Sequence, residues 1–194
     1  MVFGIRRGFT SSRRGIQLRL DRAEASVLAQ MLHQLDGLVG PGAELPDGDD
    51  PFAGLLGPDD AERPQDPALL RLFPDGYLDD TEAADEFRRF TQSGLRSLKS
   101  ERLATSLAVL ARFGDDTDKV QAVDLTAAEA ESFLTTSNDL RLVLGVRLDI
   151  VTDDQDVSQD WSDDDARQAT FGAYQWLTWL QAGLLDAMAS RKDS

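Results

Sequence analysis

The chain has 194 residues, of which 41% are apolar and 28% are charged, and its formal net charge is −15 at pH 7. This length is typical of one domain, and the apolar content is sufficient for a hydrophobic core. The chain contains no cysteine and a single histidine, His33, which excludes disulfides, thiolate catalysis, cysteine-based metal sites and zinc sites with several histidines.

No segment reaches the roughly 20 apolar residues of a membrane-spanning helix, and the first residues, MVFGIRRGFTSSRR, lack the apolar stretch of a signal peptide. We therefore expect a soluble, cytoplasmic protein. Charge is spread unevenly, because residues 1–22 carry six arginines and one aspartate while the remainder carries 14 basic and 34 acidic side chains. An acidic body repels DNA phosphates, so we do not expect direct DNA binding.

Two short strands are predicted at the start of the chain. Residues 2–7 form a run of apolar and basic side chains, a turn is expected between Gly8 and Gly15, and residues 15–20 alternate apolar with polar side chains. Four arginines lie in the first strand and the turn of this hairpin: Arg6, Arg7, Arg13 and Arg14. They either protect a sheet edge from aggregation or bind a phosphate or an acidic partner, so they are candidate partner-binding residues.

Helical periodicity follows in five segments: residues 21–40, 67–73, 79–113, 126–150 and 163–190. Capping-box patterns open the first and the fourth, with Asp21 and Glu24 in one and Thr126 and Glu129 in the other. The fourth segment either continues or breaks near Thr136-Ser137.

The longest helical segment is either one helix or two helices that meet near Ser93-Gly94, and Gly114 is the expected C-cap. Its apolar positions, at helical spacing, are Phe87, Phe90, Leu95, Leu98, Leu103, Leu107 and Leu110.

A third strand is predicted at residues 118–125, and two acidic loops are predicted at residues 40–67, which are rich in glycine and proline, and at residues 150–163. Helices greatly outnumber strands. We therefore predict a mainly α (α+β) fold, in which a single-domain helical bundle over residues 1–194 carries a small antiparallel edge sheet made from the three predicted strands.

The second acidic loop matches part of the calcium-binding EF-hand pattern. The matching positions are Asp154, Asp156, Ser158, Asp160, Ser162 and Asp165. However, Gln159 stands where the pattern needs a glycine for its sharp turn, and Asp165 stands where it needs a bidentate glutamate. We therefore expect no metal and no other cofactor.

No motif singles out a catalytic site. The chain has neither a glycine-rich phosphate loop nor a GxSxG nucleophile motif, and its carboxylates are too numerous for one pair to stand out. His33 lies in a predicted helix with no nucleophile spaced to form a relay. We therefore expect a protein that is not an enzyme.

All the tryptophans lie towards the end of the chain: Trp161, Trp176 and Trp179. Their spacing favours a helix packed in the core, and the alternative is a partner-binding aromatic patch or a homodimer interface. Asn138, Asp139 and Arg141 are polar residues within an otherwise apolar helical segment. We expect them to bond neighbouring elements as a structural polar network.

Three segments carry a family resemblance: LFPDGYLDDTEAADEFRRFTQSGLRSLKSERL, NDLRLVLGVRLDI and AYQWLTWLQAGLL. With the arginine-rich first strand and the acidic loop, they make the chain similar to the actinobacterial DUF2017 family over nearly its whole length. Some members of that family are described as oxidative-stress transcriptional regulators, and members tend to be encoded near a Clp protease adaptor. The resemblance brings no catalytic residues with it.

The resemblance implies a stress-linked regulator that acts through protein partners, with a sigma factor or RNA polymerase as the expected partner. The alternative is an adaptor or regulator linked to Clp-type proteolysis, and a carboxylate-based, metal-dependent enzyme ranks last. Since the chain has no cysteine, a thiol switch cannot be its sensor.

Overall fold

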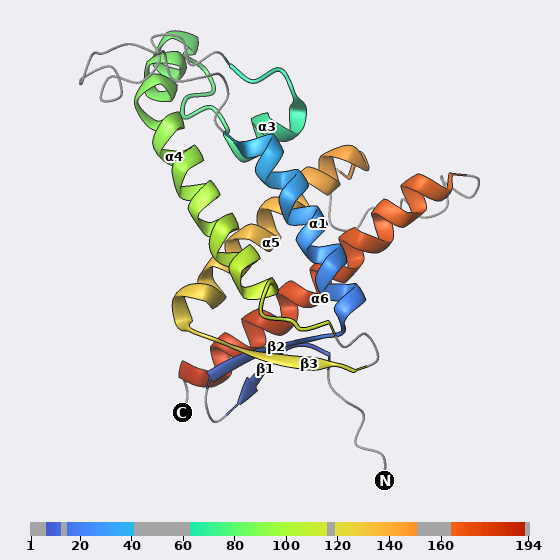
Figure 1. Ribbon diagram of the computed structural model, residues 1–194. Coiled ribbons are helices and arrows are strands. Elements are labelled where there is room, and N and C mark those ends of the chain that lie inside the picture. Colours follow the sequence, from blue (N-terminus) through green and yellow to red (C-terminus); the bar gives the residue numbers. More distant parts are fainter. Residues whose placement is uncertain (1–6, 13–14, 41–62, 116–118, 151–163, 193–194) are drawn as a thin grey trace, which may run out of the picture.

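The computed structural model describes residues 7–12, 15–40, 63–115, 119–150 and 164–192 (Figure 1). Its elements are β1 (Gly8–Ser12), β2 (Gly15–Leu20), α1 (Arg22–Val39), α3 (Pro67–Leu72), α4 (Thr81–Leu110), β3 (Gln121–Leu125), α5 (Ala127–Arg147) and α6 (Asp165–Lys192). This confirms the predicted mainly α (α+β) class with a small antiparallel sheet. Most of the two predicted acidic loops, including the calcium-like pattern up to Ser162, lies outside the described residues.

The three strands form an antiparallel sheet in the order β1-β2-β3. The strands predicted at 15–20 and 118–125 are present as β2 and β3. Residues 2–6 of the first predicted strand lie outside the described residues, and the turn expected between Gly8 and Gly15 was wrong in its first part, because residues 8–12 are a strand. Residues 8–12 form β1, although their glycine, serine and threonine content favours a turn. Phe9 overrides that preference, because its side chain is buried in the core and it pairs opposite Leu18 of β2.

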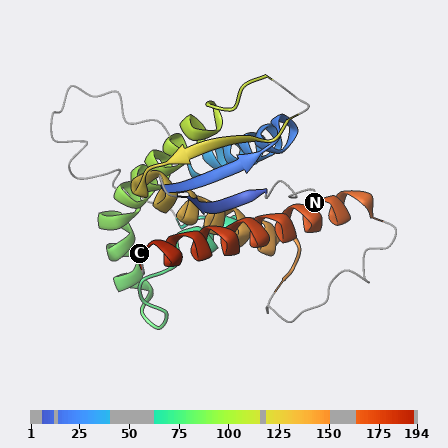
Figure 2. The same cartoon turned by 90° about the horizontal axis from the view of Figure 1, so that it is seen from below.

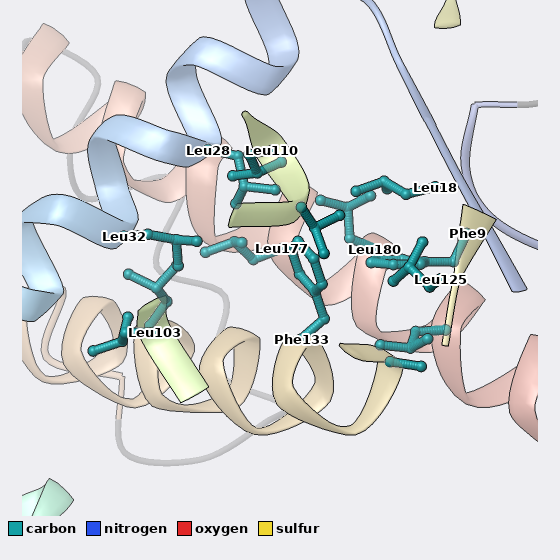
Figure 3. Close-up of a cluster of buried hydrophobic side chains, with 14 of the residues drawn as sticks. Phe9, Leu18, Leu28, Leu32, Leu103, Leu110, Leu125, Phe133, Leu177 and Leu180 are labelled. Carbon is teal, nitrogen blue, oxygen red and sulfur yellow. The ribbon is translucent and has the colours of Figure 1, made fainter. Parts of the chain in front are cut away.

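The hydrophobic core lies between one face of the sheet and the helices (Figure 3). Phe9 of β1 meets Phe133 of α5 edge to face, with ring centroids 5.6 Å apart. Full burial of one such side chain stabilises the fold by roughly 1.5–3 kcal/mol. The other labelled members of the cluster are Leu18, Leu28, Leu32, Leu103, Leu110, Leu125, Leu177 and Leu180.

Helix α6 runs along the β1 edge of the sheet (Figure 2). The approach is close, since a Cβ built on Gly183 would lie 3.4 Å from the carbonyl oxygen of Phe9. This contact covers one of the two sheet edges, which would otherwise be open to pairing with another chain.

Both predicted capping boxes are present. The Asp21 side chain accepts a hydrogen bond from the Glu24 backbone N–H, the Thr126 side chain accepts one from the Glu129 backbone N–H, and each glutamate accepts one in return. Helix α5 continues through Thr136 without a break. None of the helices in the described residues is long and apolar enough to cross a membrane.

Helix α4 is one continuous helix of 30 residues, with no interruption at Gly94. Its C-cap is Ala111, so the expectation that Gly114 would cap it was wrong. Gly114 instead bonds the side-chain amide of Gln121, donating its N–H to Oε1 at 2.8 Å and accepting from Nε2 at 3.0 Å. This pairing connects the end of α4 to the start of β3.

Candidate protein-binding surface

Large apolar side chains gather on the surface of one segment. Of the nine that are exposed in the described residues, six lie between residues 77 and 98, which makes this segment the principal apolar surface of the described chain. We call these six residues the α4 patch: Tyr77, Leu78, Phe87, Phe90, Leu95 and Leu98. The N-terminal half of α4, which carries Phe87, Phe90 and Leu95 of the patch, lies at the end of the molecule away from the sheet (Figure 1).

Helical geometry places the patch on one side of α4. Phe87 and Phe90 are neighbours along the helix surface, and Leu98 lies three turns beyond Phe87 on almost the same side. The Tyr77 ring meets the Phe87 ring edge to face, with centroids 6.1 Å apart, which connects the segment before the helix to the patch. Phe90 is 75% exposed, so most of its ring is in contact with solvent.

The opposite side of this half of α4 is polar although it faces inward. Arg88 and Gln92 are only 6% and 8% exposed. An apolar stripe at helical spacing ordinarily packs in the core. Here the stripe through Phe87 and Phe90 faces outward and charged side chains face inward, which is the reverse of the ordinary arrangement.

Acidic partners compensate the buried charge at Arg88. Arg88 donates to Asp75 and, at 2.8 Å, to Asp85 of its own helix, while Arg63 Nη2 donates to Asp75 Oδ2 at 2.9 Å. Partial burial alone would raise the pKa of Asp75, but the hydrogen bonds and positive charges of Arg88 and Arg63 outweigh it and lower the pKa below its ordinary value. This cluster fixes the segment before α4 to the helix.

Arg96 holds α4 against the C-terminal end of α1. Its Nη1 donates to the carbonyl oxygens of Val39 at 2.7 Å and Gly40 at 3.0 Å. These carbonyl groups at the helix end have no partner within α1 and attract a positive charge. The Arg96 guanidinium also lies 4.8 Å from the centre of the Phe73 ring.

Asp139 and Arg141 join α5 to two different helices. Lys99 of α4 donates from Nζ to both carboxylate oxygens of Asp139, at 2.8 Å each. Arg141 donates from Nε to Thr178 Oγ1 of α6 at 3.0 Å and lies over the Tyr174 ring. Asn138 is exposed and lies outside these contacts. The structure therefore places two of the three predicted network residues at helix–helix contacts.

The two tryptophans in the described part of the chain, Trp176 and Trp179, do not form one surface patch. Trp176 is half-buried and packs against the core, as the core interpretation expects, whereas Trp179 is 51% exposed. Trp179 lies against β1, where a Cβ built on Gly8 would come within 2.7 Å of its ring. Trp161 lies outside the described residues.

Of the four candidate arginines Arg6, Arg7, Arg13 and Arg14, only Arg7 lies within the described residues, and it has a structural role. Its Nη1 donates to Asp21 Oδ2 at 3.0 Å and to Glu24 Oε1 at 2.5 Å, the two residues of the α1 capping box. The hydrogen bond to Glu24 is the largest cause that raises the pKa of Arg7. Arg6, Arg13 and Arg14 lie outside the described residues.

The described residues that were considered for catalysis or metal binding do not come together in one site. His33 is exposed on α1. Asp165 is the first residue of α6, and its neighbour Asp164 accepts a hydrogen bond from the Arg167 backbone N–H at 3.0 Å, as a helix-capping side chain does. Among the described residues, no three histidine, aspartate or glutamate side chains are grouped in a way that could hold a metal ion.

Sequence reasoning identified the apolar positions of α4 but missed that those in its first half form a surface. The sequence of the same segment contains a second pattern, which competes with the apolar residues for the interior. Arg88, Arg96 and Lys99 also recur at helical spacing, so one helix carries an apolar stripe and a cationic stripe. Two of their partners are distant in the sequence, since Asp75 is 13 residues from Arg88 and Asp139 is 40 residues from Lys99, and only the folded chain brings these groups together.

Acidic side chains surround the start of the patch. Those exposed in this segment are Asp79, Asp80, Glu82, Asp85 and Glu86. Arg88 and Arg96 point inward, which leaves Arg89 as the exposed cation within residues 77–98. The solvent-facing side of this region is therefore apolar with an acidic rim.

Comparison with known proteins assigns the chain to a family. It matches the sequence profile of the family described as "Domain of unknown function (DUF2017)" over residues 6–188. Proteins named "Oxidative stress regulator AosR" from Mycobacterium tuberculosis and Mycobacterium bovis are 37% identical over 140 residues, which cover 68% of this chain and 62% of each relative.

A Mycobacterium leprae relative is 34% identical over 135 residues, which cover 66% of this chain and 61% of the relative. The match thus spans less than two thirds of the length of these mycobacterial proteins. No solved structure matches the chain. Because the family profile covers most of the sequence, the chain belongs to the DUF2017 family, as its three characteristic segments predicted.

Proposed function

We propose that this protein is a non-enzymatic, stress-linked regulator that acts through protein–protein contacts with the transcription machinery. The observation that carries the proposal is the α4 patch, an exposed apolar stripe on a helix whose Arg88 and Arg96 face inward. The names of the mycobacterial relatives, which are oxidative stress regulators, support the stress-linked role.

The composition of the patch suits protein binding. Exposed apolar patches with a polar rim mark interaction sites on soluble proteins. Aromatic side chains such as Phe87, Phe90 and Tyr77 are preferred at interface centres, where a few residues supply most of the binding free energy.

The charge of the chain supports a basic partner. A net charge of −15 creates a field that attracts positively charged surfaces and accelerates their association. Basic surfaces are common on proteins that bind nucleic acid, which includes RNA polymerase and sigma factors. Binding driven in part by this field weakens as salt rises, because salt screens exposed charges.

The test is fluorescence anisotropy of the labelled protein against RNA polymerase core enzyme, with and without each sigma factor, at low and high salt. We expect saturable binding, with a dissociation constant in the micromolar range or below, that weakens at high salt. Absence of binding under all these conditions would contradict the transcription role. Binding to a Clp adaptor or protease instead would support the alternative linked to proteolysis.

A further inference from the structure

We infer that the α4 patch binds a single amphipathic helix with basic flanks, contributed by a partner protein. This inference rests on the proposed partner-binding function and specifies the chemistry of the partner. Three features of the described residues carry it: the linear shape of the patch, the glycine at its centre and the acidic rim.

The shape of the patch matches one helix. From Phe87 to Leu98 the apolar side chains follow α4 for about three turns, or about 16 Å. An amphipathic helix presents its own apolar anchors over the same length, at positions i, i+3 or i+4, and i+7. A partner helix packed along α4 would therefore cover Phe87, Phe90 and Leu98 together.

Gly94 lies within this stretch, four residues after Phe90 and four before Leu98. A Cβ built at this position meets nothing within 4 Å, so no contact within the described residues requires a glycine there. Glycine in a helix interior costs about 1 kcal/mol relative to alanine. A small residue on a helix surface lets a second helix approach closely, which gives this glycine a role in an interface.

Charge identifies the partner as basic. Asp79, Glu82 and Glu86 are exposed beside the patch, and they would pair with lysine or arginine side chains that flank the apolar face of a partner helix. A second copy of this chain brings another charge of −15, and like charges oppose that association. The observations therefore favour a basic helix over a homodimer.

The probe for the test is a fluorescent peptide of about 18 residues of leucine and lysine, with leucine at helical spacing, a length sufficient for helix formation on binding. One control peptide has the same composition in scrambled order, and another has glutamate in place of lysine. Each is titrated with the full chain, and circular dichroism verifies that every variant is folded.

Two variants of the patch have matched controls. Phe90→Ser and Gly94→Gln alter the patch, whereas Leu185→Ser and Gly172→Gln change an exposed leucine and an open helical glycine of α6. We expect the leucine–lysine peptide to bind the wild-type chain, and each patch variant to weaken that binding about tenfold or more. The α6 variants should stay within about twofold of wild type, and both control peptides should bind at least about tenfold more weakly.

Several results would overturn the inference. They are absence of binding, equal affinity for the scrambled peptide, or equal affinity of Phe90→Ser and wild type. Light scattering that shows a wild-type dimer and a Phe90→Ser monomer would also overturn it, because a second copy would then occupy the patch.

Binding to RNA polymerase and binding to the peptide test the proposed function and the helix-binding inference separately. RNA polymerase binding that persists in Phe90→Ser would place the contact elsewhere, which overturns the inference and leaves the function standing. Peptide binding that depends on Phe90, without any binding to RNA polymerase, supports the inference and refutes the transcription role.

Discussion

At the scale of single residues, the contact between Lys99 and Asp139 is the most enclosed ion pair that joins two helices in the described part of the chain. The two side chains are 15% and 9% exposed, and Lys99 Nζ donates to both carboxylate oxygens. The Phe73 ring lies 5.8 Å from the same ammonium group. Removal of one partner would leave a desolvated charge without compensation.

Asp139→Ala should therefore lower the free energy of unfolding by about 3 kcal/mol, measured by urea denaturation. The matched control is Asp186→Ala, which removes an exposed carboxylate from α6 and should change stability by less than about 0.5 kcal/mol. Replacing both partners, with Lys99→Met and Asp139→Leu, should restore most of the loss. Equal stabilities of Asp139→Ala and the control would contradict this account.

Asp75 predicts how stability responds to acid. Its pKa in the folded chain lies below the ordinary value of 3.8, so ionised Asp75 stabilises the fold above about pH 4, and this contribution disappears as pH falls through the lowered pKa. The urea midpoint should fall as the pH decreases below about 4, and less steeply in Asp75→Asn than in wild type. Asp79→Asn removes an exposed carboxylate nearby and serves as the control. Identical slopes in wild type and Asp75→Asn would show that Asp75 is not the group responsible.

At the scale of secondary structure, most elements follow from local signals in the sequence. The capping boxes at Asp21 and Thr126 predict where α1 and α5 begin, because a cap satisfies backbone groups only a few residues away. The alternation at 15–20 predicts β2 for a similar local reason. The position of β1 could not be predicted in this way, because it depends on the burial of Phe9 against distant residues such as Phe133.

The orientation of α4, like the position of β1, could not be predicted from local sequence signals alone. Periodicity identifies the apolar positions of a helix, but two stripes on one helix compete for the interior. The cationic stripe is buried because Asp75 and Asp139, which belong to other segments, accept its hydrogen bonds. The candidate surface could therefore not be derived from the pattern of α4 alone.

Gly94→Ala tests whether the fold requires a glycine at the centre of α4. A methyl group fits there without contact, so the free energy of unfolding should rise by about 0.5–1 kcal/mol. At Gly8, by contrast, φ is +79° and Trp179 fills the space above the Cα, so Gly8→Ala should be destabilising. Thermal denaturation followed by circular dichroism would measure both. A lower melting temperature for Gly94→Ala would mean that the fold itself requires this glycine.

At the scale of the whole molecule, the core and the candidate surface are at different places along the same helix. The end of α4 contributes Leu103 and Leu110 to the core near the sheet, while the exposed patch lies on the preceding part of the helix, up to Leu98, and on the segment before it (Figure 1). A substitution such as Phe90→Ser therefore removes apolar surface without opening a cavity in the core. This separation allows binding and folding to be tested independently.

The most direct test of the account compares Phe90→Ser with Leu185→Ser in binding to RNA polymerase core enzyme and its sigma-factor complexes, by fluorescence anisotropy. Both changes remove an exposed apolar side chain, one from the α4 patch and one from α6. We expect affinity to fall about tenfold or more for Phe90→Ser and to stay within about twofold of wild type for Leu185→Ser. Equal affinities of wild type, Phe90→Ser and Leu185→Ser would contradict the claim that the α4 patch is the partner-binding surface.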